Sequence, residues 1–196
     1  MFRHAHFSLR ISLAVASLCV AGAIAVDADA PRGWHLAGSK PADYETGIDA
    51  AQAYQGHASA YLKNKAAHTE GFGTLMQSIS ARQYLGSKVR LSGLVKSEEV
   101  TGWGGLWMRV DRFNTMLSID NMQNRAIKGT TGWQRYDVVL DVPKDATRVA
   151  FGILLNGPGE VWLNSARLEL VGLDVPTTSV NEDKLPEKPV NLEFAD

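Results

Sequence analysis

The chain has few of the residues, and none of the common motifs, on which metal sites, catalytic centres and nucleic-acid contacts usually depend. Of its 196 residues one is a cysteine, Cys19, and five are histidines. Acidic and basic residues nearly balance, at 21 and 20, and no basic stripe indicates contact with a phosphate backbone. No G-x-S-x-G, H-E-x-x-H or phosphate-loop motif is present. These shortages argue against nucleic-acid partners, cysteine-based metal sites and the commonest catalytic centres.

Carboxylates remain as the catalytic candidates. Glycosidases hold two of them about 5 to 10 Å apart, and Asp111 and Asp120 fall in segments that could become neighbouring strands. Acids on strands are common, however, and usually serve the structure. We therefore predict a protein without enzyme activity.

The first 25 residues have the pattern of a secretory signal. Two arginines precede an apolar run at residues 11–26, and an Ala-Ile-Ala sequence allows cleavage after Ala25. The run is short for a membrane span of about 20 residues, so we expect no stable span after cleavage. Because Cys19 lies inside the run, the mature protein would have no disulfide. We expect an exported protein, periplasmic or extracellular, with one domain at residues 26–172.

Alternating apolar and polar residues dominate after residue 55 and predict β-strands. No stretch shows sustained helical periodicity, apart from a short helical turn expected at residues 81–86. Many strands joined by Gly and Pro turns, without crossover helices, favour an all-β fold, an antiparallel sandwich or barrel. The strands that we expect cover residues 58–63, 72–80, 88–100, 104–111, 116–122, 134–143, 147–156 and 160–171.

Three connections between these segments carry specific expectations. The sequence TGWGG at residues 101–105 predicts a turn. Residues 127–133 are expected to form a loop. Gly157-Pro158-Gly159 is expected to close a hairpin between the last two strands.

The end of the chain differs in composition. Residues 173–196 are rich in Pro, Thr, Asp, Glu and Lys, which is typical of a linker or tail. An apolar group at residues 190–194 lies near its end. This group is either a frayed tail or a strand that returns to cover an open sheet edge.

The segment GGLWMRVD at residues 104–111 has two unlike faces, because successive side chains of a strand point to opposite sides. One face, which we predict to be core, is apolar: Leu106, Met108 and Val110. The other face carries an aromatic plate, a guanidinium and a carboxylate: Trp107, Arg109 and Asp111. This second face is either a ligand platform or a structural polar cluster on an outer wall. The sequence leaves both interpretations open.

Three stretches resemble strands of bacterial carbohydrate-binding modules with the galactose-binding-like jelly-roll fold. They are GHASAYL (56–62), YLGSKVRLSGLVKSEEV (84–100) and VPKDATRVAFGILLNGPGEVWLNSARLELV (142–171). The likeness covers roughly residues 34–171 and implies a jelly-roll β-sandwich. GLWMRVD also resembles a bacterial group of exported or fused domains, some of them labelled transcriptional regulators. No helix-turn-helix pattern is visible in this chain.

The resemblance also implies a structural calcium ion, which such modules often hold near the chain ends. The paired acids of their closing strand are replaced here by Asn164 and Ser165, which argues against that site. Asp43, Glu45 and Asp49 offer hard oxygen ligands of the kind that calcium prefers. Acids of a turn explain the same residues more simply, so we expect no cofactor.

The resemblance and the polar face together predict a non-catalytic module that binds carbohydrate or a similar polar ligand. Aromatic rings pack on the apolar faces of sugars, and polar side chains bond to the hydroxyl rim. Trp133 fits either this platform or the end of a core, and Trp162 is predicted to be core. The alternatives are a domain that docks an envelope protein and a sensory or accessory module related to those fused to regulators or hydrolases. The ligand residues that we expect are Trp107, Arg109, Asp111, Gln77, Trp103, Asn121 and Arg125.

Overall fold

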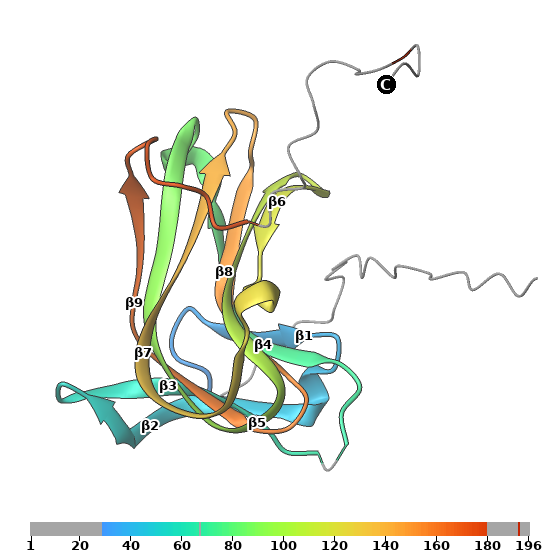
Figure 1. The fold of residues 1–196 in the computed structure, drawn as a ribbon, viewed down its shortest axis with the longest axis vertical. Helices are drawn as coiled ribbons and strands as arrows, with labels where there is room; N and C mark the ends of the chain where they lie inside the picture. Colours follow the sequence, from blue (N-terminus) through green and yellow to red (C-terminus); the bar gives the residue numbers. More distant parts are fainter. Residues whose placement is uncertain (1–28, 67, 180–191, 193–196) are drawn as a thin grey trace, which may run out of the picture.

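The computed structural model describes residues 29–66, 68–179 and 192, whose fold is shown in Figure 1. Within these residues all regular elements are antiparallel strands, apart from three short 3-10 turns, and none is a helix able to span a membrane. The predicted all-β sandwich is confirmed, and so is the short helical turn, which begins at Ala81. The strands are β1 (His35–Gly38), β2 (Tyr44–Tyr54), β3 (His57–Asn64), β4 (Phe72–Ser80), β5 (Ser87–Arg112), β6 (Thr115–Asp120), β7 (Ile127–Val142), β8 (Arg148–Asn156) and β9 (Glu160–Val171).

One long strand, β5, holds the two layers of the sandwich together. Its first half pairs with β9 and β7, and its second half pairs with β8 and β6. The strand therefore descends in one layer, bends near the bottom of Figure 1 and returns in the other. We call β2, β3, β9, β7 and the first half of β5 the first layer. The second layer is β1, β4, β8, β6 and the second half of β5.

The turn predicted at TGWGG is wrong, because these residues stay within β5. Bulges bend the strand instead, since its register with β7 shifts three times between Val95 and Gly104. Gly102 allows a close approach: a Cβ there would lie 2.1 Å from the carbonyl oxygen of Asn156. The loop predicted at residues 127–133 is wrong as well, because it forms the first part of β7 and bends along with β5.

The hairpin predicted between the last two strands is also wrong. β8 and β9 do not pair with each other: β9 pairs with β5 before its bend and β8 pairs with it after the bend, so the Gly157–Gly159 connection crosses from one layer to the other. Gly159 has a φ of +124°, and a Cβ there would lie 2.7 Å from the Cα of Val100. A glycine turn looks the same in a hairpin and in a tight crossover. The choice between them depends on β5, which is distant in the sequence.

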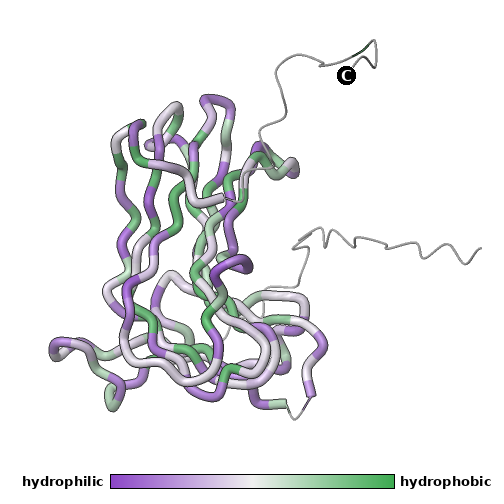
Figure 2. The backbone as a smooth tube through the Cα atoms, viewed as in Figure 1, coloured by the Kyte–Doolittle hydropathy of each residue, from purple (hydrophilic) through white to green (hydrophobic). Residues whose placement is uncertain are grey.

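The main core lies between the layers and contains the apolar face of GGLWMRVD, as predicted. Figure 2 shows apolar and polar residues alternating along the upright strands. Apolar side chains of both layers meet in one buried cluster, which includes Leu75, Leu91, Leu106, Met108, Val110, Ile153, Val161 and Leu163.

The residues after β9 run back across the first layer to the outer edge of β7. The Lys88 ammonium donates to the carbonyl oxygens of Leu173 (3.0 Å) and Val175 (2.6 Å). Farther along, the Thr178 backbone N–H donates to Val139 O (2.9 Å), and the Val139 N–H donates to Thr178 Oγ1 (2.7 Å). The segment to Thr178 is therefore attached to the domain. The predicted signal and nearly all of the apolar group at 190–194 lie outside the described residues.

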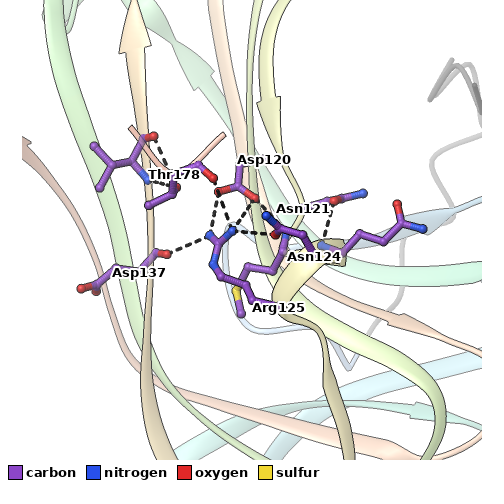
Figure 3. Close-up of polar contacts among 9 residues, drawn as sticks. Asp120, Asn121, Asn124, Arg125, Asp137 and Thr178 are labelled. Carbon is purple, nitrogen blue, oxygen red and sulfur yellow. Dashed lines mark hydrogen bonds and ion pairs between the residues drawn. The ribbon is translucent and has the colours of Figure 1, made fainter. Parts of the chain in front are cut away.

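A polar cluster around Arg125 fixes this segment between β6 and β7 (Figure 3). Arg125 Nη2 lies 2.6 Å from Asp120 Oδ2, and its guanidinium also donates to the carbonyl oxygens of Asp137 (3.2 Å) and Thr178 (3.4 Å). The Asp120 side chain is 1% exposed, so its charge depends on this partner. Arg125 thus joins three separate segments at the edge of the sandwich.

Replacing Asp120 with alanine should lower the free energy of unfolding by about 3 kcal/mol, because a charged partner is left behind in a partly buried site. Urea denaturation measures this loss. The matched control is Asp145→Ala, which removes an exposed pair with Arg112 (2.7 Å) and should cost less than about 1 kcal/mol. Equal losses in the two variants would show that the Arg125 cluster does not stabilise the edge.

Candidate ligand-binding site

The polar face of GGLWMRVD lies on the outer face of the second layer, opposite the core, and it is closed. Trp107, Arg109 and Asp111 are only 2%, 8% and 3% exposed, respectively. β8 and β6 flank this part of β5, so it is an interior strand of the second layer. The burial favours the structural interpretation of the three residues over the ligand platform.

Trp107 forms the base of a small apolar cluster outside the main core. Its ring packs with Met76, Ala150 and Leu154, and its Nε1 donates to Thr74 Oγ1 (2.7 Å) on β4, two strands away. The indole therefore reaches across β8, where Gly152 lies in register between Met76 and Trp107. An outer sheet face is usually polar, so a buried apolar cluster there is unusual.

The two charged residues of the face are already paired. Arg109 Nε lies 3.0 Å from Asp111 Oδ1, and Arg148 donates to Asp111 Oδ2 from Nε (2.9 Å) and Nη2 (2.8 Å). Asp111 therefore has a partner on its own strand and one on β8. These contacts compensate a charge that would be costly to bury alone.

The structure separates the other predicted ligand residues. Gln77 does not share the Trp107 face: it is in register with Phe151 and Met108, whose side chains are in the main core. Asn121 lies after β6, where its Oδ1 accepts a hydrogen bond from the backbone of Gln123 (3.1 Å), and Arg125 belongs to the cluster of Figure 3. Trp103 does share the face of Trp107, and it is half-buried at the margin of that cluster.

A cross-strand row at this margin offers an accessible surface. Phe72 on β4, Asn156 on β8 and Trp103 on β5 are aligned in register, and all three are half-buried. Both rings pack against the Trp107 cluster. Two strand spacings place their Cα atoms about 10 Å apart. Within the described residues the Asn156 side chain has no hydrogen-bond partner. We call these residues the Phe72 row.

Sequence reasoning missed Phe72 and Asn156. Phe72 was visible as the first residue of a strand, and Asn156 as the last residue of another, but neither carries a local signal of function. Only the pairing of β4, β8 and β5 places them beside Trp103.

The outer face of the first layer carries the other two tryptophans that sequence analysis considered. Trp162 is buried, but on this face and not in the main core: its Nε1 donates to Asp49 Oδ2 (3.0 Å), and the Lys96 Nζ lies 5.0 Å from the centre of its ring. Trp133 is half-buried and packs edge-on against Tyr54, with ring centres 5.7 Å apart. The end of β2 thus folds over the first layer.

Asp49 is the ionisable residue at the centre of these contacts. Partial burial raises its pKa, but hydrogen bonds from Trp162, Ala51 and Gln52 and the Lys96 ammonium outweigh this effect, so the pKa lies below its ordinary value. The carboxylate is engaged by these donors. Among the described residues no three His, Cys, Asp or Glu side chains gather as metal ligands. The expectation that the protein holds no cofactor stays a prediction.

Comparison with known proteins supplies the relatives of this fold. No family model matches the chain. A protein of Bacillus subtilis (strain 168), described as the uncharacterized HTH-type transcriptional regulator YbfP, is 44% identical over 166 residues, which are 83% of this chain. The chain spans 56% of the length of that relative.

Three solved structures share the arrangement of the strands. The CBM22-1 xylan-binding domain of Paenibacillus barcinonensis Xyn10C has a TM-score of 0.53 at 19% identity and covers 76% of this chain and 92% of its own. The CBM22-1–CBM22-2 tandem of the same protein gives 0.55, at 17% identity, with 78% and 45% covered. The tailspike protein 4 domain of bacteriophage CBA120 gives 0.53, at 15% identity, with 74% and 20% covered.

The chain has the fold of a carbohydrate-binding module. The resemblance found in the sequence is therefore confirmed at the level of the fold. The relative from Bacillus subtilis carries the regulator label that the resemblance also included. At these identities the solved structures establish the fold alone.

Truncation of Trp107 tests its structural role. Trp107→Ala should lower the free energy of unfolding by about 3 to 5 kcal/mol, because it empties the base of the outer cluster and frees Thr74 Oγ1. Chemical denaturation gives the value, and Trp103→Ala is the matched control with a smaller loss. A change below about 1 kcal/mol in Trp107→Ala would contradict a structural role.

The variant Trp162→Phe tests the contact that lowers the pKa of Asp49. Removing the indole donor should raise this pKa toward its ordinary value, as measured by NMR titration. A carboxyl group with a lowered pKa stabilises the fold at any pH above its unfolded pKa of about 3.9. This stabilisation is lost as the pH falls through the folded pKa. Part of the stability that Trp162→Phe loses should therefore be missing at pH 7, whereas in strong acid this part of the difference from the wild type should disappear. An unchanged pKa would contradict the contact.

Proposed function

We propose that this domain binds carbohydrate through the Phe72 row. The observation that carries the proposal is the row itself: two half-buried aromatic side chains flank an amide whose groups are unpaired within the described residues. Aromatic rings pack against the C–H faces of sugars, and an amide both donates to and accepts from hydroxyl groups. The buried Trp107 cluster supports both rings from beneath.

The known fold supports this proposal without specifying the ligand. A xylan-binding domain has the same strand arrangement, so a neutral polysaccharide such as xylan is the first probe. The Phe72 row contains no ionisable side chain, which suits a neutral ligand. We infer that the domain acts by binding alone, because its buried carboxylates Asp111 and Asp120 are paired with arginines and separated from the row.

The cellular setting of this binding is a further part of the proposal. The signal pattern in residues 1–25 supports export to the periplasm or the extracellular space. The likeness to a protein named as an HTH-type regulator favours a second candidate function, a sensory or accessory unit that binds the same class of ligand. Fractionation of cells that express the full chain separates the exported binding module from the sensory or accessory unit. An envelope protein that binds without sugar would favour the docking interpretation instead.

Trp103→Ala should weaken binding of xylo-oligosaccharides at least tenfold, because one of the two aromatic rings of the row is lost. Isothermal titration calorimetry measures the affinity, and circular dichroism checks that the fold is intact. Phe113→Ala is the control, since Phe113 is an aromatic residue 76% exposed on the β5–β6 turn, away from the row.

Other neutral glycans should be screened on an array with the same variants. Loss of binding in Trp103→Ala and not in Phe113→Ala supports the proposal for whichever glycan binds. Equal binding by the wild type and Trp103→Ala would overturn the assignment of the Phe72 row.

A further inference from the structure

We propose a second binding site, on the outer face of the first layer, for the carboxylate of an acidic saccharide. The saccharide class rests on the proposed carbohydrate binding, whereas the charge of the ligand follows from the residues of this site. The two sites lie on opposite faces of the sandwich, so each can be tested without the other.

The site is built by the end of β2, which folds over the first layer and is held at three points. Asp49 accepts from Trp162 on β9 (3.0 Å), and Gln52 Oε1 accepts from Lys96 Nζ on β5 (2.7 Å). The third contact is the edge-on packing of Tyr54 against Trp133 of β7. Each point engages a different strand, so the turn between β2 and β3 is fixed above the sheet.

Beside this turn the surface is hollowed by about 300 Å³. The turn supplies one side of the hollow, and three strands of the sheet supply the rest. Tyr54 and Gln55 come from the turn, Leu94 from β5, Arg135 from β7, and Ser165 and Arg167 from β9. A concave site with convergent polar groups is the usual form of a small-ligand site.

Two arginines border this hollow from opposite sides of β5. Arg135 is in register with Leu94, and Arg167 is in register with Ser92, so their Cα atoms lie about 12 Å apart. Long side chains bridge such a gap from both ends, so both guanidinium groups can reach one carboxylate. Arginine suits this task because its planar fork donates two parallel hydrogen bonds to a carboxylate.

The charges of these arginines are only partly balanced within the described residues. Arg167 has no ion pair or hydrogen bond there. Arg135 meets Asp137 through Nε (3.3 Å from Oδ1), which leaves its two terminal amino groups available. Two cations against one carboxylate give the hollow a net positive charge in a protein whose formal net charge is −1. The local excess favours an anionic ligand.

A buried hydroxyl without a partner lies next to the hollow, on the same face of the sheet. Ser92 is 1% exposed, and its Oγ has no hydrogen-bond partner in the described part of the chain. It lies between Arg167 and Asp137 in the register of the sheet, on the side away from the core. A buried polar atom without a partner is rare in native proteins.

The remaining groups of the hollow suit a sugar ring better than a bare inorganic ion. Tyr54 offers an aromatic surface, and Gln55 and Ser165 offer polar groups for hydroxyls. A sugar with a carboxylate, a uronic acid, combines the two requirements. Phosphate or sulfate alone would use the arginines but not the ring or the hydroxyl partners.

The test is calorimetric titration of the full chain with trigalacturonate. Arg135→Gln and Arg167→Gln should each weaken binding at least tenfold, and rising salt should weaken the wild type. Two variants should bind trigalacturonate like the wild type. One is Arg112→Gln, which removes an exposed arginine at the end of β5. The other is Trp103→Ala. Circular dichroism checks each fold.

Several outcomes would overturn the second site. These are no binding of trigalacturonate at millimolar concentration, unchanged affinity in both arginine variants, and equal competition by inorganic phosphate. Failure of xylo-oligosaccharides to bind, with the arginine effects intact, would reject the Phe72 row and keep this site. Loss of trigalacturonate binding in Trp103→Ala alone would place the acidic sugar on the opposite face and reject the arginine hollow.

Discussion

The bend of β5 is the constraint on which the rest of the structure depends. One strand of 26 residues supplies a central element to both layers, so neither layer can form without it. Bulges and the close packing of Gly102 against Asn156 let the strand turn without leaving the sheet. β9 pairs with this strand before the bend and β8 pairs with it after the bend, so the tight Gly157–Gly159 connection must cross from one layer to the other.

The same constraint decides which faces are open. In the second layer, glycine on β8 leaves room for Trp107 to reach β4, and the outer face becomes a small core with its own paired charges. Around this small core the half-buried aromatic side chains lie at the margin, at Phe72 and Trp103. In the first layer the end of β2 covers Trp162 and leaves a hollow beyond its tip. Both proposed binding surfaces therefore lie beside the buried aromatic residues, not on them.

Sequence reasoning succeeded where the information is local. Alternation located β3, β4, β6, β8 and β9 to within a few residues and assigned Leu106, Met108 and Val110 to the core. It failed where a distant strand decides the outcome. TGWGG and Gly157–Gly159 have ordinary turn composition, and only pairing with β5 shows that one is a bend and the other a crossover. Gln77 was misplaced for the same reason, since β8 separates β4 from β5 and sets its register.

The two proposed sites differ in the physical terms that would hold a ligand. The Phe72 row is neutral and aromatic, so its contacts are dispersion and hydrogen bonds, which salt screens little. The arginine hollow is exposed and cationic, so ionic strength should decide its affinity. Both sites draw on β5, through Trp103 after the bend and Leu94 before it. A substitution that straightens the bend would therefore disturb both faces together, whereas changes at either margin should act on one face alone.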